Sequence, residues 1–187
     1  SGIKAIHVVL GDGELPEMLQ TPVMAVLSEI ETLELRIKAI EKRLQEMTQQ
    51  NEAVQRLQQI SGIGLLTSTA IVASAGSPHH FKSGRHFSSW MGITPRESSS
   101  GHRRTLGRIT KKGDTYLRML LIHGARSVLA RAKTVARSKT NSLSRLQQWA
   151  LSLEKRIGHN KATVALANKM ARIAWAVWRH ETDYDAQ

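Results

Sequence analysis

The chain has 187 residues, 41% of them hydrophobic, with no cysteine and a formal net charge of +12. The lack of cysteine excludes a disulfide framework and a thiolate metal site, and it fits a reducing cytoplasm as the expected location. No apolar run approaches the roughly 20 residues that a membrane-spanning helix needs, so no membrane partner is expected. The positive charge instead predicts a polyanionic partner.

This positive charge is concentrated in one part of the sequence. Between residues 80 and 140 there are fourteen lysines and arginines and two acidic residues, Glu97 and Asp114, whereas the rest of the chain has thirteen of each sign. A general solubility function would spread the charge more evenly. A solvated basic surface is the alternative, but the concentration favours a surface that binds nucleic acid.

Residues 1–20 contain three glycines and a proline, which predict a linker or the remnant of an upstream domain. Residues 21–56 predict one long helix that starts at Thr21-Pro22, since proline is tolerated in a first helical turn. Apolar residues recur there at alternating spacings of three and four, the pattern of a heptad seam. The seam consists of Val23, Val26, Ile30, Leu33, Ile37, Ile40, Leu44 and Met47.

The same register continues through Asn51 to Val54, and a polar Asn51 at a heptad a position would fix the pairing of two helices. An amphipathic helix docked on its own domain is the alternative interpretation. The narrow seam favours a coiled coil between chains, so a homo-oligomer is expected.

A compact helical domain is expected over residues 57–187. It opens with Gly62-Ile63-Gly64 between two helical stretches, the arrangement of a helix-hairpin-helix element. Backbone amides at the start of the second helix can hold a phosphate without reading bases, so Gly62 and Gly64 are candidate nucleic-acid contacts. A simple helix C-cap has the same pattern.

Residues 77–89 are a predicted polar loop with three histidines, for which no metal is expected because carboxylate and cysteine partners are missing. The following segment, residues 90–93, is expected to be buried. Further helices are predicted over residues 115–136, 146–156 and 161–180, with the tryptophans of the last in the core. The predicted fold class is all-α: a long coiled-coil helix followed by a compact helical domain.

Three consecutive serines, Ser98 to Ser100, stand between clusters of positive charge. A serine hydroxyl is a poor nucleophile in water, but adjacent guanidinium groups neutralise a bound phosphodiester and stabilise the charge that develops when its phosphorus is attacked. Glycines in the same stretch allow close backbone approach. Without further information, such a serine run is usually a flexible loop. The basic residues around it are Arg96, Arg103, Arg104, Arg108, Lys111 and Lys112.

Four ordered blocks resemble the C-terminal transposase domain of the IS-one-ten and IS-eleven-eleven insertion-sequence family, kin of the pilin-gene inverting recombinases. The first block, residues 95–103, is similar to a pattern Pro-Arg-Gln-x-Ser-Ser/Thr-Gly-Gly-Lys, with His102 and Arg103 as departures. The others are Leu106-Gly107-Arg108-Ile109-Thr110-Lys111-Lys112-Gly113-Asp114-Thr115-Tyr116-Leu117-Arg118, Leu121-Ile122-His123-Gly124-Ala125-Arg126, and a block over residues 159–172.

The resemblance implies a DNA transposase in which Ser99 attacks a DNA phosphodiester and forms a covalent phosphoserine. Ser100 is the alternative nucleophile, at a position where the family pattern has either serine or threonine. Four arginines are the implied phosphate clamps, since a guanidinium binds two oxygens at once, and two lysines are expected to position the DNA backbone. The arginines are Arg96, Arg103, Arg104 and Arg108, and the lysines are Lys111 and Lys112.

The resemblance also implies an upstream RuvC-like nuclease domain whose acidic residues bind magnesium, and nothing in this sequence is similar to it. The chain is therefore expected to be a C-terminal fragment without a cofactor of its own, inactive alone, and nucleoid-associated when bound to DNA. Relatives of this kind imply a structured noncoding guide RNA as a second partner. The alternative function is a non-catalytic module for nucleic-acid binding and oligomerisation.

Overall fold

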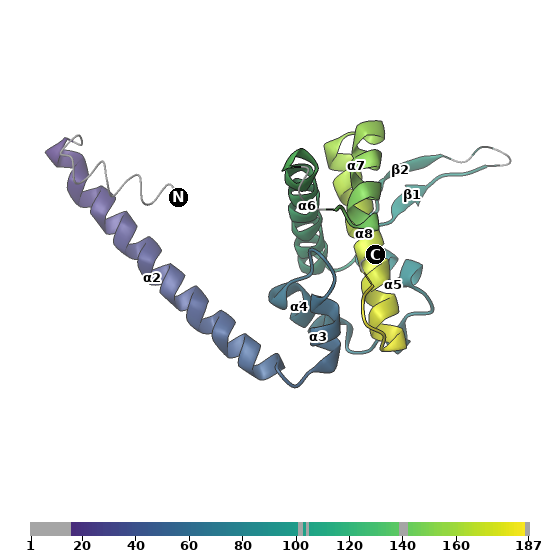
Figure 1. Ribbon diagram of the computed structural model, residues 1–187, viewed down its shortest axis with the longest axis horizontal. Helices are drawn as coiled ribbons and strands as arrows, with labels where there is room; N and C mark the ends of the chain where they lie inside the picture. Colours follow the sequence, from purple (N-terminus) through teal and green to yellow (C-terminus); the bar gives the residue numbers. More distant parts are fainter. Residues whose placement is uncertain (1–15, 101–102, 104, 139–141, 186–187) are drawn as a thin grey trace. The chain divides into compact units, whose positions relative to one another are not determined.

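The computed structural model describes residues 16–100, 103, 105–138 and 142–185. These residues form two compact units, one up to residue 47 and one from residue 48 onward. Figure 1 shows a mostly helical chain with one projecting β-hairpin, so the all-α prediction is confirmed. The helices are α2 (Glu17–Thr48), α3 (Glu52–Gln58), α4 (Leu65–Ala75), α5 (Gly84–Trp90), α6 (Thr115–Ser138), α7 (Arg145–Ile157) and α8 (His159–His180), with a 3-10 turn η1 (Pro78–His80).

The hairpin consists of β1 (Pro95–Glu97) and β2 (Leu106–Ile109), which pair antiparallel. Pro95 lies opposite Ile109 and Glu97 opposite Leu106, with one irregularity in register between these pairs. Both strands are short and mostly exposed. They therefore lack the alternation of apolar and polar residues that would identify them in the sequence.

Helix α2 begins at Glu17, four residues before the predicted start, and contains Pro22 in its second turn. Proline removes one backbone N–H donor from that turn. Most of the heptad seam is exposed on this single helix, as Ile37 at 54%, Ile40 at 67% and Met47 at 73% illustrate. Such a row of apolar side chains is unusual on a helix that has no partner.

The prediction of one helix over residues 21–56 is wrong at its C-terminal end. Helix α2 ends at Thr48, and α3 begins at Glu52 after an extended residue, Asn51. The Asn51 side chain accepts a hydrogen bond from the Val54 N–H at 3.2 Å, so Asn51 caps α3 and is not a heptad residue. Asparagine is a poor interior helix residue but a good N-cap, which explains the break.

Helix α8 lies at the centre of the larger unit and packs against α3, α5, α6 and α7. Its buried face combines small side chains with a few large ones, which lets the neighbouring helices approach closely. This face consists of Ala162, Thr163, Leu166, Ala167, Met170, Ala171, Ala174, Val177 and Trp178. Trp178 is 7% exposed, so its predicted place in the core is confirmed.

The predicted polar loop over residues 77–89 is wrong, because it contains η1 and α5. Ser83 caps α5 by accepting from the His86 N–H, and Phe87 is fully buried. Phe81 packs edge-on against Phe87 with ring centroids 4.8 Å apart. The short helix was missed because its sequence has too few apolar residues to show a period. None of the helices in the described residues is long and apolar enough to cross a membrane.

Candidate nucleic-acid interface

The serine run lies on the β-hairpin rather than in an open loop. The Ser98 N–H donates to the Thr105 carbonyl oxygen at 2.9 Å. Ser100 and Arg103 exchange two backbone hydrogen bonds, of 3.2 and 3.1 Å. Antiparallel pairing therefore continues past β1 and β2 and holds the backbone on both sides of Ser99.

Ser99 presents its side chain to solvent, and its Oγ donates a hydrogen bond to Oε1 of Glu97 at 2.9 Å. Residues two apart in an extended strand share a face, so the local backbone brings these two side chains together. The sequence predicted Ser99 as the nucleophile but did not identify a partner for its hydroxyl. The structure identifies one.

Close backbone packing anchors the base of the hairpin. Gly113 has φ +122°, and a Cβ atom there would overlap the carbonyl oxygen of Trp90. Gly92 has φ +70°, and a Cβ atom there would overlap the carbonyl of Lys112. Both positions need a residue without a side chain. The Lys111 N–H adds a hydrogen bond of 3.1 Å to the Gly92 carbonyl oxygen.

Two polar residues of the second family-like block also hold this base. The Asp114 carboxylate accepts from the Leu117 N–H at 2.9 Å and so caps α6. The Arg118 guanidinium donates to the Met91 carbonyl oxygen at 3.0 Å and to the Thr115 hydroxyl at 3.1 Å. Arg118 therefore connects α6 to the segment that leads into β1, which is a structural use of its charge.

The predicted phosphate clamps have different surroundings. Arg96 is exposed, but its Nη2 donates to the Thr110 carbonyl oxygen at 3.4 Å, across the hairpin. Arg103 is exposed beside Ser100, near the end of the hairpin. Arg104 lies outside the described residues. The hairpin thus brings Arg103 close to the serine run, while Arg96 leans back towards the base.

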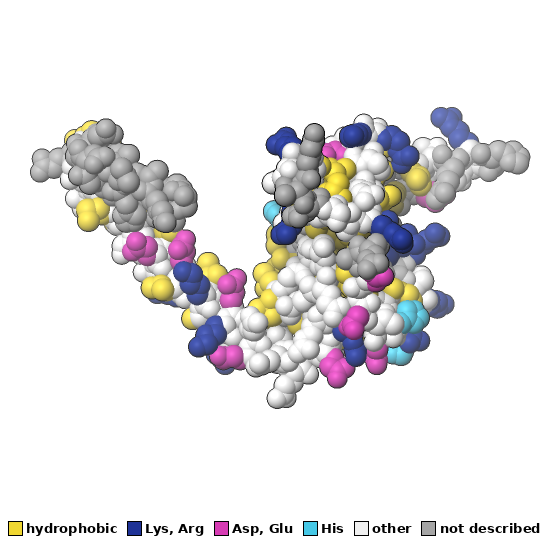
Figure 2. All heavy atoms as spheres, viewed as in Figure 1, with side chains coloured by type: hydrophobic (Ala, Val, Ile, Leu, Met, Phe, Trp, Pro, Cys, Tyr) yellow, Lys and Arg dark blue, Asp and Glu magenta, His cyan; other side chains and the backbone are white. Residues whose placement is uncertain are grey.

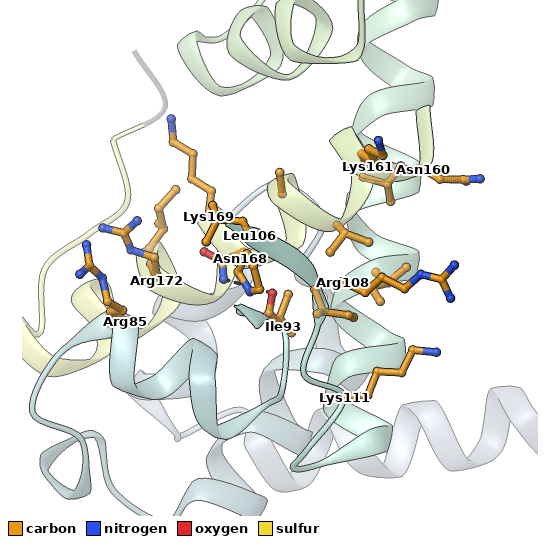
Figure 3. Close-up of a pocket in the computed structure, with 18 of the residues that line it drawn as sticks. Arg85, Ile93, Leu106, Arg108, Lys111, Asn160, Lys161, Asn168, Lys169 and Arg172 are labelled. Carbon is orange, nitrogen blue, oxygen red and sulfur yellow. Dashed lines mark hydrogen bonds between the residues drawn. The ribbon is translucent and has the colours of Figure 1, made fainter. Parts of the chain in front are cut away.

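A groove of about 2110 Å³ borders the base of the hairpin and is shown in Figure 3. It lies between β1, β2, α5, α6, α7 and α8. Small-molecule sites have volumes of roughly 300 to 1,000 Å³, so this groove suits a polymer better than a metabolite. Its basic lining residues are Arg85, Arg108, Lys111, Arg126, Lys161, Lys169 and Arg172, and no described lining residue is acidic.

Two of the predicted contacts, Arg108 and Lys111, line this groove, whereas Lys112 is exposed outside it. Figure 2 shows lysine and arginine side chains gathered along the upper and right-hand edges of the larger unit, beside the hairpin, with most carboxylates near the lower edge. The local charge that the sequence predicted is therefore a surface feature of the folded unit.

Sequence reasoning missed most of the α8 contribution to the groove. Lys161, Lys169 and Arg172 occupy the face of α8 opposite to its buried stripe. Their spacing of eight and three residues is a helical signal that the sequence contains. What the sequence could not provide is the approach of this face to the hairpin base, where Asn168 Nδ2 donates to the Ile93 carbonyl oxygen at 3.5 Å.

Two half-buried tryptophans also line the groove. The Lys169 ammonium lies 4.2 Å from the centroid of the Trp149 ring, a cation–π contact. Trp175, which the sequence placed in the core, donates its indole N–H to the Pro78 carbonyl oxygen at 3.1 Å. Both tryptophans contribute to the lining of the groove.

One basic residue of α6 is neutralised and lies outside the groove. Lys133 Nζ is 2.7 Å from Oε1 of Glu154, and Nδ1 of His159 contacts the same oxygen at 2.7 Å. The hydrogen bond from Lys133 holds the pKa of the Glu154 carboxyl below its usual value, against an opposing effect of burial, and His159 also lowers it. This cluster joins α6, α7 and the start of α8.

The sequence is similar to those of known proteins. Residues 54–141 match the model of the Transposase IS116/IS110/IS902 family. The chain is 42% identical over 170 residues to a probable family 20 transposase of Pseudomonas aeruginosa, covering 91% of this chain and 48% of that protein. It is 40% identical over 144 residues to the transposase for insertion sequence element IS1111A of Coxiella burnetii, covering 77% and 38%.

A third relative is the transposase for insertion sequence element IS1328 of Yersinia enterocolitica, 34% identical over 175 residues, which cover 94% of this chain and 50% of that protein. The chain belongs to the IS116/IS110/IS902 transposase family. It spans about half the length of the curated relatives it matches.

The matched family region includes most of α3, all of α4 to α6 and the hairpin, but the groove extends beyond it. Trp149, Lys161, Lys169 and Arg172 all lie on the C-terminal side of residue 141. The groove therefore combines elements inside and outside the matched family region.

The Gly62-Ile63-Gly64 turn joins α3 to α4, as expected for a helix-hairpin-helix element. Gly62 has φ +87°, and a Cβ atom there would lie 2.7 Å from side-chain atoms of Val128 and Met170. Gly64 caps α4 without a side chain and has open space around it. Gly62 thus has a packing role, and phosphate binding by the turn stays a prediction.

Proposed function

We propose that this chain supplies the nucleophile of a DNA transposase, the Ser99 hydroxyl, and part of the surface that holds its DNA. The observation that carries the proposal is the exposed Ser99 hydroxyl, hydrogen-bonded to Glu97, on a hairpin whose base borders a groove with basic and no acidic described lining residues. The transposase relatives support DNA as the substrate. Since the chain spans about half their length, the proposal concerns this half of the activity.

In the proposed step, Ser99 Oγ forms a bond to a DNA phosphorus, and the bond from that phosphorus to one bridging oxygen breaks. One DNA end is then joined to serine as a phosphodiester, and the other ends in a hydroxyl. The serine proton goes to solvent, and the leaving oxygen takes a proton from solvent. Attack by a DNA hydroxyl on the phosphoserine reverses the step, so strands can be exchanged without an external energy source.

Glu97 is proposed as a positioning residue for this hydroxyl. The family pattern has glutamine at the corresponding position, and an amide oxygen accepts the same hydrogen bond as a carboxylate oxygen. We therefore expect Glu97→Gln to retain most of the covalent product and Glu97→Ala to lose about tenfold or more, because a small misplacement of a nucleophile is costly. Equal losses in both variants would mean that the carboxylate charge itself is required.

The cations around Ser99 have a separate proposed role. Arg103, near the serine run, is proposed to neutralise the attacked phosphate together with Arg108 at the groove. Lys111 would position the DNA backbone, as would Lys112. Guanidinium groups are suited to the first role because they present two donors in one plane to two phosphate oxygens.

Magnesium is expected only in the upstream domain that the family resemblance implies. In the parts of this chain that the structure describes, no three histidine or carboxylate side chains are placed to hold a metal ion. The residues here do not fit a magnesium site, and no step above runs through one. The 187-residue chain alone is therefore predicted to bind nucleic acid without cleaving it.

Self-association through α2 is part of the same proposal. Its exposed apolar seam supports a coiled coil with a second copy. Charges at two seam positions, Ile37→Glu with Leu44→Glu, should abolish a dimer seen by light scattering, because each would bury an unpaired ion. A monomer before any substitution would refute this. Guidance by a noncoding RNA remains a prediction from the resemblance.

The deciding experiment uses the extended protein, meaning this chain together with the upstream domain and guide RNA that the resemblance implies. It is incubated with end-labelled DNA, denatured, and digested, and the labelled peptide is mapped by mass spectrometry. We expect a phosphodiester on Ser99 that is absent in Ser99→Ala. Ser100→Ala is the matched control and should retain the adduct.

An adduct mapped to Ser100, or full strand exchange by the Ser99→Ala protein, would overturn the assignment of the nucleophile. The alternative function, a binding module whose chemistry lies wholly upstream, predicts unchanged activity of Ser99→Ala and no adduct on this chain. The exposed and hydrogen-bonded hydroxyl of Ser99 favours the catalytic proposal over that alternative.

A further inference from the structure

Two arginines from different helices meet at the side of the groove away from Arg108 and Lys111. Figure 3 shows Arg85 of α5 and Arg172 of α8 with their side chains extended in the same direction. Both residues are exposed, and both line the groove. Neither was identified as a functional residue from the sequence.

Backbone packing fixes this pair in place. Gly84, the first residue of α5, lies so close to α8 that a Cβ atom would be 3.0 Å from the carbonyl oxygen of Arg172 and 3.1 Å from its Cα. A side chain at residue 84 would therefore have to displace the α8 backbone. The close approach places Arg85 directly beside Arg172, on two helices that are packed into the core.

These guanidinium groups have no counter-charge of their own. In the part of the chain for which the structure gives side chains, neither makes a hydrogen bond or an ion pair, and the groove lining contains no carboxylate. Other arginines are used differently: Arg56 pairs with Glu52 at 2.8 Å, and Arg118 donates to backbone and hydroxyl oxygens. Two adjacent like charges repel each other unless an anion lies between them.

Lys169 adds a third cation on the same side of α8. It lies one helical turn before Arg172, and its ammonium is held over the Trp149 ring. The result is a basic cluster on rigid helices, separate from the cations on the hairpin. Guanidinium pairs of this kind suit phosphate, whose oxygens accept several donors at once.

We propose that Arg85 and Arg172, assisted by Lys169, form a phosphate-binding site for the backbone of the DNA strand that lies in the groove. The site binds the DNA backbone independently of the base sequence and of the serine hairpin. It therefore holds the substrate while the hairpin contacts one phosphate. This inference rests on the proposed function for its ligand, DNA.

The test measures binding of the 187-residue chain to a mixed-sequence DNA duplex by fluorescence anisotropy over a range of salt concentrations. We expect the double variant Arg85→Gln and Arg172→Gln to bind at least tenfold more weakly. The slope of log affinity against log salt should fall by about 0.9 for each phosphate that the variant no longer neutralises. The double variant Lys155→Gln and Arg156→Gln is the matched control, since it removes two exposed cations outside the groove.

Replacement by lysine sharpens the test. Arg85→Lys with Arg172→Lys keeps both charges and should retain the salt slope while reducing the affinity in part, because lysine cannot bind two oxygens in one plane. Thermal unfolding of every variant should match the unmodified chain, since both side chains are exposed. If the glutamine pair unfolds at a different temperature from the unmodified chain, the lysine pair decides the test, because it keeps both charges on long aliphatic side chains.

Each outcome supports or overturns the site. Unchanged DNA binding in the glutamine pair, or an equal loss in the Lys155 and Arg156 control, would overturn it. A loss seen only with a structured RNA hairpin would assign the site to RNA and overturn the DNA assignment. If the site fails while the extended protein still forms the Ser99 adduct, the proposed function stands. If the unmodified chain binds no nucleic acid, the proposed function loses its binding surface as well.

Discussion

The tip and the base of the hairpin are adjacent in sequence but differ in how closely their backbone is packed. The tip, residues 98–105, is exposed wherever the structure describes it, and Ser99 contacts Glu97 at the solvent surface. The base, residues 90–94 together with 110–114, is packed so closely that Gly92 and Gly113 have no room for a side chain. One stretch of family-like sequence thus contains both exposed residues at the tip and closely packed glycines at the base.

This contrast separates the motif residues that stabilise the fold from those that a ligand can reach. Gly113, Asp114 and Arg118 hold the hairpin onto α6 through backbone packing, a helix cap and a hydrogen bond. The side chains of Ser99 and Arg103 are exposed and therefore accessible to a ligand. Substitutions at the base should therefore act through stability, and substitutions at the tip through chemistry.

The largest effect is expected for Gly113→Ala. Its φ of +122° is strained for any residue with a side chain, and the added methyl group would overlap the Trp90 carbonyl oxygen. We expect a loss on the order of 3 kcal/mol or more in the free energy of unfolding, measured with urea. Gly107→Ala is the matched control, because its nearest atom is 3.8 Å away. Equal losses in the two variants would contradict the anchored base.

A smaller effect is expected for Asp114→Ala. This substitution removes the carboxylate that accepts from the Leu117 N–H, and loss of such a cap costs about 1 kcal/mol. Asp114→Asn should recover most of the loss, since asparagine is an equally good N-cap. The measurement is urea unfolding at neutral pH. A loss that asparagine does not restore would indicate that Asp114 acts through its charge.

An effect below about 1 kcal/mol is expected for Glu154→Gln, because ion pairs near the surface contribute little. The pKa of Glu154 is lowered in the folded chain by Lys133 and His159. Its contribution is therefore present above the unfolded pKa and is lost as the pH falls through the lowered folded pKa. The stability difference between the two proteins should exist at pH 7 and vanish in acid. A difference that persists in acid would contradict this cause.

The helices were predictable because their burial follows from periodic apolar residues. Helices α6 and α8, which the sequence predicted, bury apolar residues such as Leu117, Leu121 and Met170. The predicted helix through residue 56 failed at Asn51, where a local capping bond wins over a continued heptad pattern. The heptad pattern alone does not show whether Asn51 continues the helix or caps the next one.

The candidate site was predictable only in part. Positive charge identified Arg108 and Lys111 as candidates, and the structure places both cations at one groove. The choice of Ser99 among the three serines came from the family resemblance. The role of Arg85 and Arg172 depends on the close approach of Gly84 to α8, between residues far apart in sequence. No local pattern encodes such an approach, so a single sequence could not show it.

The smallest effect on stability is expected for Ser99→Ala, and it is the sharpest test of the contrast between tip and base. The Ser99 side chain is exposed, and its hydroxyl bonds only to an exposed carboxylate among the contacts that the structure describes for it. Removing it should change the free energy of unfolding by less than about 0.5 kcal/mol. In the extended protein the same substitution should eliminate the covalent DNA adduct and leave DNA affinity unchanged. A marked loss of stability would place Ser99 with the structural residues of the base, because the loss of activity would then result from unfolding.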